Sequence, residues 1–204
     1  MTEQALRGGG LVLAAGVGRR FGSDKRRARL ASGDTLLETT LTRWLQALPV
    51  VRAVLRAATE PTERELAASL HVRFPDLAIT HAAHWAEGMG ASLAAGIADC
   101  QDWDYVVIGL GDMPALQEAT IHAIAVELEE RCRSGEVDAV VRPRHDDRPG
   151  HPVGFGKGHF RALLNSSGDI GARRVVSAHA HVIDLPCSDP GIHRDIDTPD
   201  QLQL

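Results

Sequence analysis

The sequence predicts a layered α/β domain with a mostly parallel central sheet. Short apolar runs alternate with amphipathic segments of helical period along the whole chain. The run YVVIGL, at 105–110, is continuously apolar, as expected for a central parallel strand buried on both faces. A length of 204 residues suits one compact domain.

Strands and helices are expected to alternate in chain order, with a Pro- and Gly-rich loop over 142–155 that leads into an edge strand. The expected strands cover 11–15, 50–59, 77–80, 105–112, 138–143, 151–155 (the edge strand) and 181–185. The expected helices cover 35–48, 61–70, 88–100, 119–133, 158–165 and 170–180, and a further helix starts after Pro199.

Residues 1–10 are expected to form a disordered lead-in, so the single domain covers 11–204. The lead-in lacks the cationic start and long apolar block of a signal peptide. No apolar run approaches about 20 residues, so no membrane span is expected. Three cysteines without a CxxC pair fit a reducing cytoplasm. The net charge of −5 argues against nucleic acid or an anionic membrane as a partner.

A glycine-rich loop, AAGVGRRFGSDK, follows the first expected strand. Its glycines are Gly16, Gly18 and Gly22. A bare loop between a strand and a helix exposes backbone N–H groups to an anion, usually phosphate. A tight turn is the alternative, but the cations Arg20 and Lys25 favour phosphate. The loop matches neither the Walker pattern nor the dinucleotide fingerprint.

Carboxylates follow at two places. Asp112 comes directly after the central strand, at the sheet edge where ligands bind in open α/β sheets. Asp195 and Asp197 alternate in an extended segment near the C-terminus. Asp112 could instead cap a helix or lie in a turn. Because Mg²⁺ needs only one or two protein carboxylates, Asp112 and Asp197 would suffice to bind it.

Six motifs, in order, resemble those of the MobA-like nucleotidyltransferases, which include the molybdopterin guanylyl- and cytidylyltransferases. They are LAAGVGRRFGSDK, EGMGASLAAGI, GLGDMP, GHPVGF, GDIGARRVV and DIDTPDQL. The second, fourth and fifth resemble the cytidylyltransferase branch. The run RRARL after Lys25 departs from the family, in which this segment is usually apolar.

The resemblance implies a three-layer Rossmann-like nucleotidyltransferase fold, a Mg²⁺-NTP substrate and release of pyrophosphate. By the same resemblance, Arg20 and Lys25 are catalytic and bind the phosphates, and Asp112 and Asp197 hold Mg²⁺. The nucleotide-binding residues would be Leu13, Ala14, Ala15, Gly16, Gly18, Gly90 and Ser92. Ala15 stands where guanylyl relatives tend to carry glycine, which favours CTP.

The acceptor is expected to contact His151, Asp169 and Arg173, although a helix cap and a solvated helix face explain the last two equally well. The expected activity is transfer of CMP from Mg-CTP to the phosphate of a molybdopterin-type acceptor. A molybdoenzyme or its chaperone is a candidate partner. Two alternatives are an NTP transferase acting on another phosphorylated acceptor, such as a sugar or alcohol phosphate, and a redox or cofactor-carrier protein.

Overall fold

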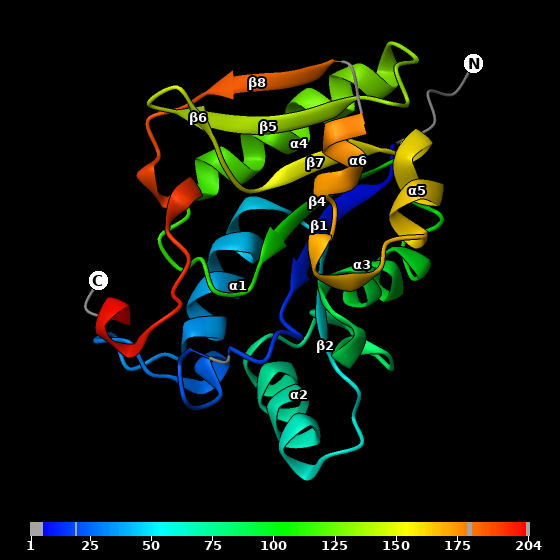
Figure 1. Cartoon of the computed structure of the whole chain (residues 1–204). Helices are drawn as coiled ribbons and strands as arrows, with labels where there is room; N and C mark the ends of the chain where they lie inside the picture. The colour runs from blue at the N-terminus through cyan, green and yellow to red at the C-terminus, as the bar shows by residue number, and fades with distance from the viewer. Residues whose placement is uncertain (1–5, 19, 179–180, 203–204) are drawn as a thin grey trace.

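The structure is a computed structural model that describes residues 6–18, 20–178 and 181–202. It has the expected α/β fold, a mostly parallel sheet between two layers of helices (Figure 1). The strand order is β3-β2-β1-β4-β7-β5-β6, and β8 also pairs with β5. None of the helices within the described residues is long and apolar enough to span a bilayer.

Parallel pairing joins β1, β2, β3 and β4, and it also joins β5 to β8. The antiparallel pairs are β4 with β7, β7 with β5, and β5 with β6. The strands are β1 (Gly8–Leu13), β2 (Val51–Arg56), β3 (Ala78–Ala82), β4 (Tyr105–Leu110), β5 (Val140–His145), β6 (Arg148–Pro149), β7 (Val153–Gly156) and β8 (Val182–Pro186).

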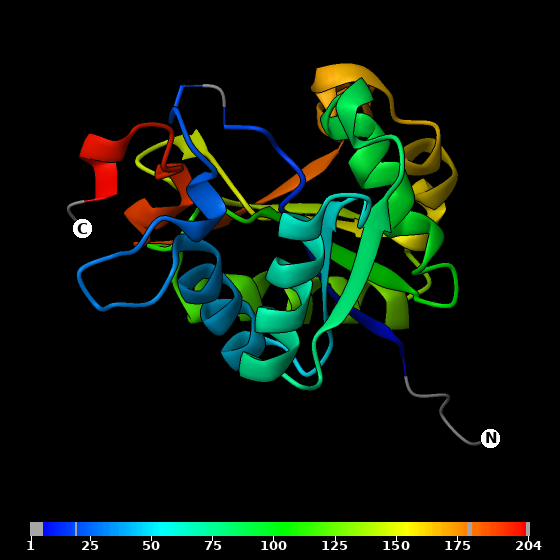
Figure 2. The ribbon, with the colours of Figure 1, turned by 90° about the horizontal axis from the view of Figure 1, so that it is seen from below.

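Alternating strand residues supply two cores, one on each face of the sheet. Helices cover both of these faces (Figure 2). Val12 and Val107 face the core formed with α1 (Leu36–Ala47), α2 (Pro61–Arg73) and α4 (Glu118–Arg133). Leu11 and Val106 face the core formed with α3 (Met89–Ala98), α5 (Phe160–Leu164) and α6 (Arg173–Ala178). The last two residues of the helix expected over 170–180 lie outside the described residues.

The first strand begins at Gly8, so residues 8–10 do not belong to a disordered lead-in as expected. Aromatic rings pack directly on this backbone because its glycines carry no side chain. A Cβ at Gly8 would lie 2.3 Å from Tyr105, and one at Gly10 would lie 2.6 Å from Trp44. Residues 1–5 of the expected lead-in lie outside the described residues.

The segment 151–155, expected at an edge of the sheet, instead lies inside it. β7 pairs with β4 on one side and with β5 on the other. Phe155 is fully buried, and a Cβ at Gly154 would lie 2.4 Å from Leu128 in α4. The small and apolar residues of this short strand therefore fit a position covered on both faces.

Candidate active site

A pocket of about 690 Å³ opens where β1 and β4 end, at the carboxyl edge of the parallel sheet. Its lining includes Leu13, Ala14, Ala15, Gly16, Val17, Gly18, Lys25, Arg26, Trp85, Gly88, Met89, Ser92, Asp112, Asp169, Arg173, Asp195 and Asp197. The C-terminal segment, red in Figure 1, returns beside the blue loop after β1 and adds its two aspartates.

The glycine loop, residues 14–18, begins where β1 ends. The Ala14 N–H continues the sheet by donating to Val54 O at 2.9 Å. The carbonyls of residues 14, 15 and 16 accept hydrogen bonds from arginine side chains rather than from a neighbouring strand. Gly18 has a φ of 61°, in the left-handed region that favours glycine, and the stem of Lys25 packs against it.

Lys25 lies in the short 3-10 helix η1 (Lys25–Arg27) and links this N-terminal segment to the C-terminal segment. Its ammonium donates to Asp112 Oδ2 at 2.6 Å, to Ile196 O at 2.9 Å and to Asp197 Oδ1 at 3.2 Å. The Ile196 N–H donates in turn to Asp112 O at 2.9 Å. A single cation therefore contacts both carboxylates that the sequence paired across the chain.

Burial and charge act in opposite directions on this group of residues. Burial alone would lower the pKa of Lys25, but the carboxylates of Asp112 and Asp197 raise it above its usual range. Burial also raises the pKa of Asp112, and the charge of Asp195 adds to this rise while Lys25 opposes it. The ammonium therefore stays charged, and the pocket keeps more carboxylates than cations around it.

The carboxylates fit a divalent metal that retains several waters. Asp112 Oδ1 is buried and has no hydrogen-bond partner in the described part of the chain, so one ligand oxygen is available. Among the described residues no group of three or more His, Cys, Asp or Glu side chains is arranged to hold a metal. Mg²⁺ tolerates this because one or two carboxylates can hold it with waters and substrate phosphates.

Eleven of the fourteen residues expected at the site line the pocket, and Arg20, Gly90 and His151 do not. Arg20 is exposed at the rim, with its Nη1 3.6 Å from Asp197 Oδ2. Gly90 packs under the loop before Asp169, where a Cβ would lie 2.5 Å from Ser167 N.

His151 is held by the segment that contains Ile192. Its backbone N–H donates to Ile192 O at 3.0 Å, and its buried Nδ1 has no partner among the residues that the structure describes. Burial lowers the pKa of His151, and the charge of Arg173 lowers it further, while Asp195 opposes this shift. The imidazole therefore lies within electrostatic reach of two pocket residues although it does not itself border the pocket.

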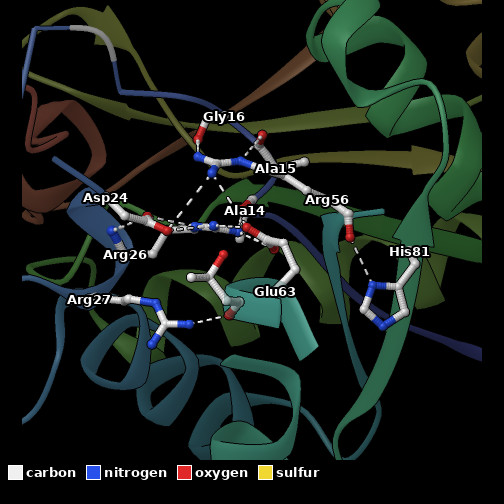
Figure 3. A network of polar contacts seen from close by, with 10 residues as sticks. Ala14, Ala15, Gly16, Asp24, Arg26, Arg27, Arg56, Glu63 and His81 are labelled. Atoms are coloured by element: carbon white, nitrogen blue, oxygen red, sulfur yellow. Dashed lines mark hydrogen bonds and ion pairs between the residues drawn. The ribbon is translucent and has the colours of Figure 1, made fainter. Parts of the chain in front are cut away.

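Sequence reasoning missed a second group of charged residues behind the glycine loop, the Arg26 cluster, formed by Asp24, Arg26, Arg56 and Glu63 (Figure 3). It also left Trp85 and Asp195 out of the expected site, although both line the pocket. One feature of the sequence indicates the Arg26 cluster. Arg56 ends a buried strand at the same sheet edge as the glycine loop, where an unpaired charge would be costly.

The chain belongs to the MobA-like NTP transferase family, because the model of the MobA-like NTP transferase domain matches residues 10–182. This assignment agrees with the bare loop and the carboxylates at the carboxyl edge of the sheet. It makes the protein a member of a nucleotidyltransferase family and implies an NTP as substrate.

Its relatives carry different names. The nicotine blue oxidoreductase of Paenarthrobacter nicotinovorans is 29% identical over 197 residues, which are 95% of this chain and 93% of the relative. The molybdenum cofactor cytidylyltransferase of Escherichia coli (strain K12) is 25% identical over 193 residues, 93% of this chain and 91% of the relative. The crystal structure of Rv0371c from Mycobacterium tuberculosis H37Rv superposes with a TM-score of 0.71 at 25% identity, covering 97% of this chain and 96% of that one.

Proposed function

We propose that this chain transfers CMP from Mg-CTP to the phosphate of a molybdopterin-type acceptor and releases pyrophosphate. The observation that carries the proposal is the Lys25 ammonium, held by Asp112 and Asp197 beside a bare glycine loop. This arrangement offers a cation, two metal-binding carboxylates and open backbone N–H groups in one pocket. A nucleoside triphosphate needs all three.

In the proposed reaction an acceptor phosphate oxygen attacks the α-phosphorus of CTP. The bond from that phosphorus to the bridging oxygen breaks, and its electrons leave with pyrophosphate. The acceptor oxygen is already anionic at neutral pH, so no general base is required. Catalysis then depends on aligning the two substrates and on neutralising the charge of the leaving group.

Lys25 is the residue placed to neutralise that charge, and Arg20 at the rim can add a second cation. Asp112 and Asp197 would hold Mg²⁺, which when bound offsets the charge of the phosphates. Asp169 and Arg173 also line the pocket, and we propose that they bind the acceptor. Their position supports an acceptor that enters from the side of α3 and α6.

Two relatives support parts of this proposal. The E. coli relative is named for cytidylyl transfer to molybdenum cofactor, and it aligns over 93% of this chain. Rv0371c has also been crystallised in complex with manganese, with a TM-score of 0.68 to this chain at 24% identity. We therefore propose CTP, a molybdenum-cofactor-type acceptor and a divalent metal for this chain as well.

The test is an assay of pyrophosphate release with Mg-CTP and the molybdenum-loaded pterin. Parallel reactions with GTP, ATP and UTP identify the base. Release that requires both the acceptor and CTP supports the proposal. Release with a sugar or alcohol phosphate instead of the pterin would keep nucleotidyl transfer and change the acceptor. No release with any of the four nucleotides would contradict the proposal.

A second candidate function is an oxidoreductase reaction on a nicotine-blue-type dye. The similarity to the P. nicotinovorans relative favours it, at 29% identity over 95% of this chain. This candidate predicts that NADH or NADPH is consumed when the dye is added, and that Asp112→Ala leaves this rate unchanged. The nucleotidyltransferase proposal predicts no dye-dependent oxidation of either cofactor.

A further inference from the structure

The Arg26 cluster lies directly behind the glycine loop and contacts three successive carbonyls of it (Figure 3). Arg26 Nη1 donates to Ala14 O at 3.1 Å. Arg56 donates through Nε to Ala15 O at 3.1 Å and through Nη2 to Gly16 O at 2.6 Å. Two arginines thus bind the loop through its main chain.

Arg26 has no donor left for a substrate. A guanidinium has five N–H groups. Those of Arg26 are directed at both oxygens of Asp24, both oxygens of Glu63 and the carbonyl of Ala14. Its side chain is 4% exposed and that of Glu63 is 5% exposed. Although Arg26 borders the pocket, it is therefore a structural cation.

Arg56 is similarly engaged. In addition to the two carbonyls, its Nη1 lies 3.4 Å from Glu63 Oε1 and 3.9 Å from Asp24 Oδ2. Its guanidinium lies 5.2 Å from the centre of the Trp85 ring, which lines the pocket. Two arginines balance two carboxylates, so the cluster offers no excess positive charge to bind a phosphate itself.

Because the peptide group is planar, the direction of each carbonyl also determines the direction of the N–H group that follows it. Within the described residues, the one cis peptide bond joins His151 to Pro152. In a trans peptide the N–H points away from the C=O of the preceding residue. With the carbonyls of residues 14, 15 and 16 held toward the arginines, the N–H groups of Ala15, Gly16 and Val17 point away from them. None of these three N–H groups donates a hydrogen bond to the described part of the chain.

We propose that Arg56, assisted by Arg26, is a positioning residue that aims the N–H groups of Ala15, Gly16 and Val17 at the nucleotide. The inference rests on the proposed function for the identity of that ligand. It assigns Arg26, in the basic run after Lys25, a role different from phosphate binding. The arginines act through the main chain, and the main chain contacts the substrate.

Arg56→Lys is the primary variant, because Arg26 is buried and its substitution also tests folding. Lysine keeps the positive charge but lacks the planar fork that spans the Ala15 and Gly16 carbonyls. Arg52→Lys is the matched control. Arg52 lies on the same strand and contacts Thr80 and Asp99 instead of the loop. Thermal unfolding establishes that each variant is folded.

The measurement is the backbone amide spectrum during titration with tripolyphosphate and, with Mg²⁺, with each of CTP, GTP, ATP and UTP. In the wild type at least one of these ligands should shift the amide signals of Ala15, Gly16 and Val17. Arg56→Lys should weaken binding of that ligand about tenfold and reduce those shifts. Arg52→Lys should match the wild type within about twofold.

Two results would overturn the inference. One is wild-type titrations in which none of these ligands moves the three amide signals, a result that does not depend on the variant folding. The other is a folded Arg56→Lys protein that binds like the wild type. If the signals move and Arg56→Lys weakens binding, but the wild type turns over none of the nucleotides, the proposed function fails and the positioning role stands.

Discussion

Lys25 and Arg26 are neighbours in the sequence, and each is bound by two carboxylates, yet the two groups differ in what they leave open. In the Arg26 cluster, Arg26 and Glu63 are buried, the charges balance, and every side-chain donor of Arg26 is engaged. The Lys25 group, formed by Lys25, Asp112 and Asp197, borders the pocket, includes the half-exposed Asp197 and leaves Asp112 Oδ1 without a hydrogen-bond partner among the described residues. The closed cluster therefore supports the loop, whereas the Lys25 group keeps a carboxylate oxygen open to a ligand.

The largest expected effect is on turnover, after a change in the open group. Asp112→Asn should reduce kcat/KM for nucleotidyl transfer by about 10²-fold or more, because it removes the charge of a proposed metal ligand that is also a partner of Lys25. Pyrophosphate release measures the rate. Asp102→Asn, which alters an exposed pair with Arg7, is the matched control and should leave the rate unchanged. Equal rates in Asp112→Asn and the wild type would show that the Lys25 group does not take part in catalysis.

The next largest effect is on stability, after a change in the closed cluster. Arg26→Met should lower the free energy of unfolding by about 3 kcal/mol, because it leaves the buried Glu63 carboxylate short of a partner. Urea denaturation followed by circular dichroism measures it. Arg27→Met is the control, since the Arg27 side chain is exposed and, among the described residues, hydrogen-bonds only the Thr62 carbonyl. If both variants unfold alike, the cluster does not stabilise the loop.

A smaller effect on stability is expected where α3 packs against the segment that precedes Asp169. Gly90→Ala places a methyl group against the Ser167 backbone and should cost about 1–3 kcal/mol of stability. The displaced segment carries Asp169, so KM for the acceptor should rise while KM for CTP stays unchanged. Steady-state kinetics with each substrate varied in turn separates the two. A rise in KM for CTP alone would contradict this and would indicate that Gly90 acts on nucleotide binding.

The smallest effect concerns an ion-pair group far from the loop, formed by Arg142, Arg144 and Asp184. The hydrogen bond from Arg142 lowers the pKa of Asp184, with Arg144 adding to the shift, while burial opposes it. The folded-state pKa is below the unfolded one, so the stabilisation is present at neutral pH and is lost as pH falls through the folded value. Because the group is partly exposed, Asp184→Asn should cost at most about 1 kcal/mol at pH 7, and the difference should vanish in strong acid. Urea titrations at both pH values check this, and a difference that grew in acid would contradict it.

The sequence was sufficient to predict the layered fold and the edge at which the site lies. The buried run at 105–110 became β4, and Asp112 follows it at the carboxyl edge. Lys25, Asp112 and Asp197 meet although they are far apart in the chain, which agrees with the shared site that the family resemblance implies for them. These features could be predicted because each depends on a local pattern or on a motif.

The features that escaped prediction depend on contacts between distant segments. The sequence predicts β7 at an edge of the sheet, because a short strand of small residues has no pattern that indicates pairing with a strand on each side. Charged residues are mostly exposed in folded proteins. Arg26 and Glu63 are buried, and only their mutual contact makes this burial favourable. Gly90 lies in a motif that resembles a nucleotide-binding segment, but its space is taken by the Ser167 backbone.

The most direct test of the central claim is calorimetric titration of the protein with CTP, with and without Mg²⁺, for the wild type and Asp112→Asn. A triphosphate bound between the bare loop and the Lys25 group predicts binding of Mg-CTP by the wild type. It also predicts affinity at least about tenfold weaker when either Mg²⁺ or the Asp112 carboxylate is absent. Equal affinity under all these conditions, or no heat of binding with CTP, GTP, ATP or UTP, would contradict it.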